Sequence, residues 1–221
     1  MKKIQGVIFD FDGTLLDSMH FWSELDREYL LRKSRVPEPH HADIFKKMSM
    51  QETLAYFQTV YGIAESKEEI LAEINSMAEE AYRNQLVLKE GALQLLMQLR
   101  QQGVRMCIAT ANHRPLVEAA LQHFGITDYF CTIITCTEIG CGKDQPEIFH
   151  LAHQILATPI EETLVFEDSL HAVITAKEAG FRVVGVYDES SKNDADAIRG
   201  FAEEYLLSLK DWSMERICSN H

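Results

Sequence analysis

The chain has 221 residues, of which 46% are hydrophobic and 25% charged, an ordinary composition for a globular protein with one large domain or with a core and a smaller domain. Its formal net charge of −13 argues against nucleic acid and anionic membranes as partners. No apolar run is long enough to cross a membrane, and Asp10 interrupts the first one too early for a signal peptide. The five cysteines form no CxxC pair and favour reduced thiols, so we expect a cytoplasmic protein. The sequence does not define the oligomeric state, and a monomer is the default expectation.

The first predicted strand ends in a pair of acids. Residues 7–9 (VIF) form an unbroken apolar run, the pattern of a strand buried on both faces. Side chains two apart on an extended segment share a face, so we expect the carboxylates of Asp10 and Asp12 to point the same way. Gly13 then allows a sharp exit from the strand. Two adjacent carboxylates repel and need a cation or a shared proton, so this stretch favours a metal-assisted site over a loop with two solvated acids.

Residues 16–88 predict a block of helices. Apolar residues recur at three- and four-residue steps over 17–33 and 50–61, and a short helix is expected over 40–47. Ser66 and Glu69 form a capping box that begins a long helix ending near residue 86. We find no convincing strand in this block and therefore assign residues 16–88 to an inserted all-helical domain of about four helices.

From residue 89 onward, strands alternate with helices. Strands are predicted over 104–109, 129–136, 163–166 and 183–187, with a short edge strand at 205–207. Helices are predicted over 92–102, 115–124, 146–156, 170–179 and 195–200. This alternation specifies an α/β fold with a Rossmann-like, doubly wound parallel sheet. Residues 1–15 and 89–221 would form this core, and the helical block, inserted directly after the paired acids, would cover the carboxyl edge of the sheet as a cap.

Polar side chains follow four of the predicted strands at their carboxyl ends, where the strands of a parallel sheet bind ligands. They are Asp10 and Asp12, Thr110 and Asn112, Lys143, and Glu167 with Asp168. Phosphoryl transfer needs this set of groups: a carboxylate can attack phosphorus, and a second acid can move the proton of the leaving group. Mg²⁺ binds carboxylates and phosphate oxygens, while an ammonium and a hydroxyl can hold the remaining phosphoryl oxygens.

These residues resemble the four motifs of the haloacid dehalogenase-like superfamily, in the order DFDGT at 10–14, Thr110, Lys143, and Glu167 with Asp168. The helical block is similar to the C1 cap of its β-phosphoglucomutase-like and phosphoglycolate-phosphatase-like branch. The resemblance covers nearly the whole chain. It implies Asp10 as nucleophile and Asp12 as general acid/base.

The same resemblance implies the remaining roles. Thr110 would bind the phosphoryl group with Asn112 beside it, and Lys143 would steady both the nucleophile and the phosphoryl charge. Mg²⁺ would be held by Asp10, by the backbone carbonyl of Asp12 and by Asp168. Glu167 is implied either as a further metal ligand or as a partner that orients one.

The chain departs from the family pattern at two places. The third motif commonly reads Lys-Pro-x-Pro, whereas here Asp144 follows Lys143, adds a negative charge and frees the backbone that proline would fix. This can change where Lys143 points. Sugar-phosphate mutases of the family carry a cap arginine for the distal phosphate, but residues 47–52 read KMSMQE and contain none.

We therefore predict a Mg²⁺-dependent phosphatase that hydrolyses a small phosphomonoester, such as a sugar phosphate, through an aspartyl-phosphate on Asp10. A sugar-phosphate mutase of the β-phosphoglucomutase type is the alternative, and the missing arginine favours hydrolysis over it. A non-catalytic sensor of a phosphorylated metabolite is a third reading, against which the intact Asp12 and Asp168 speak.

Overall fold

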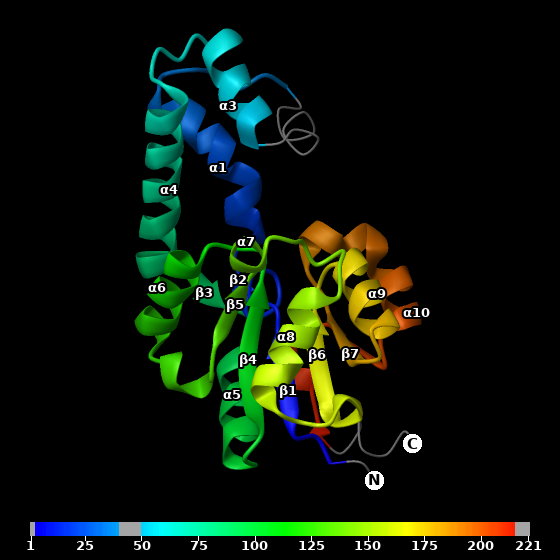
Figure 1. The fold of residues 1–221 in the computed structure, drawn as a ribbon. Helices are drawn as coiled ribbons and strands as arrows, with labels where there is room; N and C mark the ends of the chain where they lie inside the picture. Colours follow the sequence, from blue (N-terminus) through cyan, green and yellow to red (C-terminus); the bar gives the residue numbers. More distant parts are fainter. Residues whose placement is uncertain (1–2, 40–49, 215–221) are drawn as a thin grey trace. The chain divides into compact units, whose positions relative to one another are not determined.

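The computed structural model describes residues 3–39 and 50–214 (Figure 1). The chain divides into two compact units, an α/β unit built from the segments up to Met19 and from Leu86 onward, and a helical unit over His20–Gln85. These boundaries lie inside the predicted 16–88, because β2 (Leu16–Asp17) pairs antiparallel with β3 (Val87–Leu88) within the α/β unit. The prediction that this block contains no strand is therefore wrong at β2 and β3. Each of these strands has only two residues, which is too few to show a hydrophobic period.

Within the described residues, six parallel strands form one sheet in the order β5-β4-β1-β6-β7-β8. They are β1 (Gly6–Phe9), β4 (Arg105–Thr110), β5 (Ile133–Thr135), β6 (Thr163–Glu167), β7 (Arg182–Val186) and β8 (Glu204–Leu206). The predicted doubly wound α/β fold is confirmed. Strand β1 is central, pairs with both β4 and β6, and is buried at every residue, as its apolar run predicts.

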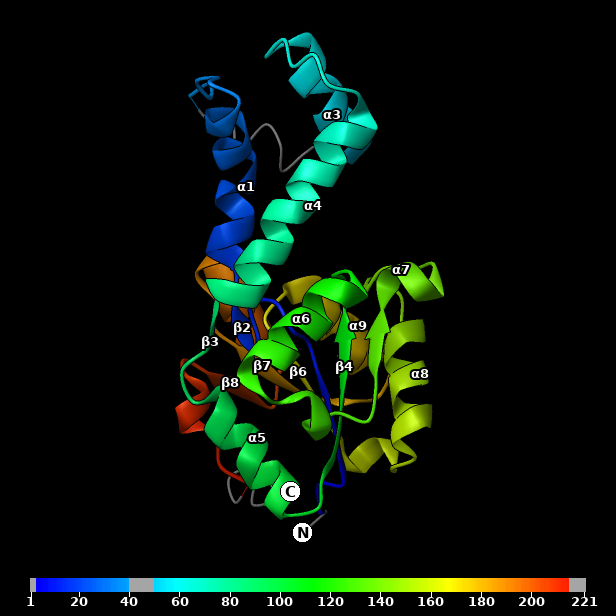
Figure 2. The same ribbon diagram turned by 90° about the vertical axis from the view of Figure 1, so that its left-hand side faces the viewer.

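Helices cover both faces of this sheet (Figures 1 and 2). One face carries α5 (Ala92–Gln101) and α6 (Arg114–Phe124), and the other carries α8 (Glu147–Leu156), α9 (Leu170–Glu178) and α10 (Ala195–Phe201). On the second face, Ile8 and Val165 of the sheet belong to one buried cluster with Phe149, Val173 and Ile198 of the helices. Each such side chain contributes about 1.5–3 kcal/mol by leaving water, so the strand ends that carry polar residues rest on a well-packed core.

One predicted strand is too long. The stretch 129–136 is a strand only over β5, because the 3₁₀ helix η1 (Thr127–Tyr129) precedes it and α7 (Cys136–Ile139) follows it directly. Thr135 is the N-cap of α7 and exchanges capping-box hydrogen bonds with Glu138, which ends the strand. The other predicted elements of the α/β unit lie within one residue of their observed bounds. Three further 3₁₀ helices were not predicted: η2 (Ile160–Glu162), η3 (Glu189–Asp194) and η4 (Leu209–Asp211).

The helical unit contains α1 (Met19–Arg32), α3 (Met50–Thr59) and α4 (Lys67–Asn84) in its described part. Its core includes Tyr29, Phe57 and Ile70. The predicted capping box at the start of α4 is confirmed: the Ser66 hydroxyl accepts from Glu69 N at 3.2 Å, and the Glu69 carboxylate accepts from Ser66 N at 2.8 Å. The helix predicted over 40–47 lies outside the described residues, as does most of the stretch 47–52. That this unit acts as a cap stays a prediction.

Two further observations concern the whole described chain. Among the helices that the structure describes, none combines the length and apolar character needed to span a membrane. The cysteines in the described part, at positions 107, 131, 136 and 141, are not disulfide-bonded.

Candidate active site

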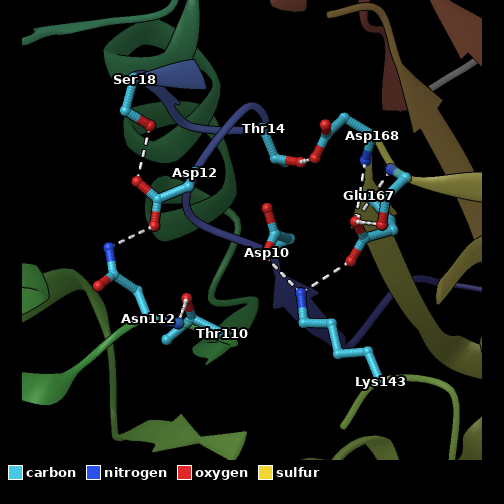
Figure 3. Close-up of polar contacts among 10 residues, drawn as sticks. Asp10, Asp12, Thr14, Ser18, Thr110, Asn112, Lys143, Glu167 and Asp168 are labelled. Atoms are coloured by element: carbon cyan, nitrogen blue, oxygen red, sulfur yellow. Dashed lines mark hydrogen bonds and ion pairs between the residues drawn. The ribbon is translucent and has the colours of Figure 1, made fainter. Parts of the chain in front are cut away.

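The polar residues gather where the strand order reverses, at the carboxyl ends of β1, β4 and β6 (Figure 3). Phe9 of β1 lies in register with Ile108 of β4 and Phe166 of β6. The backbone N–H of Asp10 continues this pairing and donates to the Phe166 carbonyl at 2.9 Å. Asp10 therefore lies beside the end of β6, where Glu167 is the last residue of the strand and Asp168 follows it.

Lys143 reaches this point from the loop after α7. Its ammonium donates to Oδ1 of Asp10 and, at 2.8 Å, to Oε2 of Glu167, and all three side chains are buried. The neighbouring Asp144 is exposed and folds back over Gly142, where an added Cβ would lie 2.5 Å from Asp144 Oδ1. Asp144 thus leaves Lys143 directed into the site, although the sequence departs from the family pattern here.

Three carboxylates form a group that can receive a divalent cation. Asp10, Glu167 and Asp168 each offer an oxygen, and these oxygens lie within 4.8 Å of one another. Oδ2 of Asp10 is buried and has no hydrogen-bond partner among the described residues. Asp168 is held close to the loop after β1, because Thr14 donates to its Oδ1 at 3.1 Å and a Cβ on Gly13, at φ +86°, would lie 2.6 Å from its Oδ2. A buried set of hard oxygen donors with an unpartnered member fits Mg²⁺.

Glu167 is the member of this group whose oxygens are already occupied. Its Oε1 accepts from the backbone N–H groups of Asp168 and Ser169, at 3.2 and 3.1 Å, and from the Ser169 hydroxyl at 2.9 Å. Its Oε2 accepts from Lys143. Of the two roles that the sequence left open, these contacts favour the partner that orients its neighbours over the metal ligand.

The Asp12 carboxylate points away from Asp10, toward Ser18 and Asn112 (Figure 3). It accepts from the Ser18 hydroxyl at 2.6 Å and from the Asn112 side-chain amide at 2.7 Å. The expectation that Asp10 and Asp12 point the same way is therefore wrong. Side-chain parity holds only on an extended chain, and the backbone turns directly after Phe11, where Leu15 N donates to the Phe11 carbonyl at 2.9 Å.

Thr110, the last residue of β4, and Asn112 lie next to each other at the carboxyl end of this strand. Thr110 is buried, and its Oγ1 accepts from the Asn112 backbone N–H at 3.0 Å. The side chain of Asn112 is engaged with Asp12, which the sequence did not predict. The sequence analysis also assigned no role to Thr14 or Ser18. The only feature that could have drawn attention to them is that both are hydroxyl residues that closely follow the paired acids.

Burial and like charge perturb the acids of this site. Burial raises the pKa of Asp10 from 3.8 to about 7, and repulsion from Glu167 and Asp12 acts in the same direction while Lys143 opposes it. Burial and the neighbouring Glu167 and Asp10 also raise the pKa of Asp168. Burial disfavours the charge on Lys143, but Asp10 and Glu167 outweigh it and raise the pKa of the ammonium. The three carboxylates outnumber the one ammonium of Lys143, so the site is compatible with a further cation.

In EDTA, Asp10→Asn is expected to stabilise the protein relative to the wild type as pH rises. Between about pH 4 and about pH 7, the folded chain keeps a proton on Asp10 that the unfolded chain releases, so wild-type stability falls across this window and stays lower above it. Asparagine carries no such penalty. The difference in melting temperature, measured by calorimetry, should therefore grow through this window. Mg²⁺ at about pH 8 should stabilise the wild type more than the variant. A difference that is independent of pH would contradict this expectation.

Comparison with known proteins agrees with the motifs. Residues 7–186 match the haloacid dehalogenase-like hydrolases. Validoxylamine A 7'-phosphate phosphatase from Streptomyces hygroscopicus subsp. limoneus is 29% identical over 92% of both chains. Mitochondrial (DL)-glycerol-3-phosphatase 1 from Arabidopsis thaliana is 30% identical over 96% of this chain and 73% of its own. A crystal structure of a candidate β-phosphoglucomutase from Thermotoga maritima superposes on this chain with a TM-score of 0.83 at 22% sequence identity. The superposition covers 98% of this chain and 99% of that protein's chain, so the two share the same fold. The chain belongs to the haloacid dehalogenase-like hydrolase family, as its motifs indicated, and is an enzyme of that family.

Proposed function

We propose that this protein is a Mg²⁺-dependent phosphatase that hydrolyses a small phosphomonoester, a sugar phosphate or a similar metabolite, through an aspartyl-phosphate on Asp10. The observation that carries this proposal is the environment of Asp10. One of its oxygens is bound by Lys143, and the other is buried and has no partner among the described residues. Two relatives that match most of the chain are named as phosphatases of small phosphorylated compounds, which supports the same substrate class.

In the first half of the proposed reaction, the Asp10 carboxylate attacks phosphorus. The bond from phosphorus to the leaving oxygen breaks as the new bond to Asp10 forms, and Asp12 gives its proton to the leaving oxygen. In the second half, Asp12 takes a proton from water, and the water oxygen attacks the phosphoryl group. The bond from phosphorus to Asp10 then breaks, and inorganic phosphate leaves with the Asp10 carboxylate restored.

Lys143 and Thr110 are proposed to hold the phosphoryl oxygens. Lys143 already lies between Asp10 and Glu167, so its charge can follow the phosphoryl group through both halves of the reaction. Thr110 is buried beside β1, and its hydroxyl hydrogen can be donated while Oγ1 accepts from Asn112 N. Glu167 is proposed to orient Lys143 and the turn that carries Asp168.

The residues of this site fit Mg²⁺. Asp10, Asp168 and the backbone carbonyl of Asp12 would hold the ion, which when bound neutralises charge on the phosphoryl oxygens. The need for such a cation agrees with the strongly negative net charge of the chain, because the overall field repels an anionic substrate. A cytoplasmic location and a monomeric state remain part of the proposal.

Phosphate release from a panel of sugar, polyol and nucleotide phosphates tests this function. We expect release from at least one of them with Mg²⁺ and none with EDTA. The same mixtures, followed by phosphorus NMR with a sugar bisphosphate added, would reveal a mutase as interconversion of sugar phosphates that outruns hydrolysis. Neither release nor interconversion, with binding of the metabolite retained, would instead indicate the sensor and would contradict the proposal.

A further inference from the structure

Both carboxylate oxygens of Asp12 are held by side chains. The Ser18 hydroxyl donates to Oδ1 at 2.6 Å, and the Asn112 amide donates to Oδ2 at 2.7 Å (Figure 3). We propose that Ser18 and Asn112 are positioning residues that fix the Asp12 carboxylate for proton transfer to and from the leaving-group side of the substrate. This inference rests on the proposed function of Asp12 as general acid/base, and it replaces the sequence-based expectation that Asn112 contacts the phosphoryl group.

The orientation of the Asn112 side chain is determined by its other contacts. Its Oδ1 accepts from the backbone N–H of His113 at 2.7 Å, so the NH₂ group must face Asp12. Its own backbone N–H donates to Thr110 Oγ1 at 3.0 Å. His113 is the N-cap of α6, which packs on the sheet. Turning the amide over would lose both side-chain hydrogen bonds, so Asn112 presents a fixed donor to Asp12.

Ser18 is held equally firmly on the other side. It is fully buried and directly follows β2, whose Leu16 lies in register with Leu88 of β3. The backbone N–H of Gly13 also donates to the Leu16 carbonyl at 2.9 Å, which closes the loop that carries Asp12. The hydroxyl of Ser18 is therefore placed against Asp12 by backbone pairing as well as by its own hydrogen bond.

The two donors differ in a way that suits an acid/base residue. An amide N–H can only donate, so Oδ2 of Asp12 stays an acceptor as long as Asn112 is in place. A serine hydroxyl can either donate or accept, so Oδ1 can gain and lose a proton while the contact with Ser18 persists. The attacking and leaving oxygens of a phosphoryl transfer lie on opposite sides of phosphorus. Asp10 would attack phosphorus from one side. A carboxylate that points away from Asp10 is therefore suited to the opposite side, where the leaving oxygen lies.

Two substrates distinguish this role from a phosphate contact. 4-Nitrophenyl phosphate releases a stabilised phenolate that needs no proton, whereas glycerol phosphate releases an alkoxide that does. We expect Asn112→Ala to lower kcat/KM for the alkyl substrate by about 10²-fold and for the aryl substrate by less than about 5-fold, because general acid catalysis is worth about 10²–10⁴. Ser18→Ala should show the same selectivity and serves as a second variant should Asn112→Ala fold poorly. Asn84→Ala, in the helical unit, is the matched control.

A double-variant cycle with Asp12→Asn completes the test. Asparagine can keep both contacts of Asp12 but cannot transfer the proton, so Asp12→Asn should show the selective loss, and adding Asn112→Ala should cost less than about 3-fold more. Equal losses on both substrates with weaker inhibition by inorganic phosphate, or a loss that adds in full to that of Asp12→Asn, would overturn the inference. If Asp12→Asn lowers kcat/KM equally for the alkyl and aryl substrates, the proposed acid/base role of Asp12 is wrong, and the inference about Asn112 and Ser18 fails with it. This outcome is read from the Asp12 variant alone and is therefore distinguishable from a failure at Asn112.

Discussion

Asp10→Asn is expected to lower kcat/KM for every accepted phosphomonoester by at least about 10⁴-fold, because the amide cannot attack phosphorus. The substitution keeps the shape of the side chain and removes one charge from a group that already holds too many acids. The variant should therefore be folded, and in EDTA more stable than the wild type. Loss of activity together with gained stability is a combination that misfolding cannot produce.

The control for this variant is Asp128→Asn, the same substitution at an exposed carboxyl of η1. We expect its activity to stay within about twofold of the wild type, since surface substitutions away from a site change little. Rates are measured as phosphate release at saturating Mg²⁺. Asp10→Asn with more than a tenth of wild-type activity would show that another group attacks phosphorus, and the mechanism proposed here would be wrong.

Lys143→Met is the second substitution with a large expected effect. The ammonium lies between Asp10 and Glu167 with 5% of its side chain exposed, so its removal leaves buried carboxylates without their cation. Breaking a buried ion pair in this way costs about 3–5 kcal/mol, which for a chain of this size corresponds to a fall of roughly 10 °C in melting temperature. Activity should fall by about 10²–10³-fold, because the phosphoryl group loses a preorganised positive charge.

The pH dependence identifies the cause of this destabilisation. In EDTA it should be larger at about pH 8 than at about pH 5, where the carboxylates can take up protons and lose their charge. Adding Glu167→Gln to Lys143→Met should restore part of the stability. Lys192→Met removes an exposed lysine paired with Glu189 and should change stability by less than about 1 kcal/mol. A Lys143→Met variant as stable as the wild type at both pH values would contradict the charge balance described for this site.

The α/β fold could be predicted because its elements are strongly patterned and alternate regularly along the chain. The central strand is a short apolar run buried on both faces, and glycine ends several of the following helices. The pairing of Leu16–Asp17 with Val87–Leu88 could not be predicted, because two residues carry no period and the partners are far apart in sequence. The strand predicted over 129–136 is too long because the β-branched and aromatic residues of this stretch favour a strand. The capping box formed by Thr135 and Glu138 marks the end of the strand and was present in the sequence.

The candidate site was predictable to the level of residues but not of side-chain directions. Parallel strands bring their carboxyl ends to one edge, and this topology is enough to place Asp10, Glu167 and Asp168 together. The direction of the Asp12 side chain depends on the tight turn around Gly13, and the contact of Asn112 depends on how β4 leads into α6. The turn is local, but its residue pattern does not fix a side-chain direction. The contact of Asn112 with Asp12 joins residues that are 100 positions apart in the sequence, which no local pattern encodes.

The most direct test of the account is the chemical identity of the phosphorylated residue during turnover. The enzyme would be mixed with Mg²⁺ and a good substrate, quenched in acid within the first turnovers, digested, and analysed by mass spectrometry. We predict that the peptide containing Asp10 gains the mass of one phosphoryl group, and that reduction with borohydride converts this residue to homoserine, as expected of an acyl phosphate. Phosphate release without any phosphorylated peptide, or with the phosphoryl group on a residue other than Asp10, would contradict the proposed mechanism.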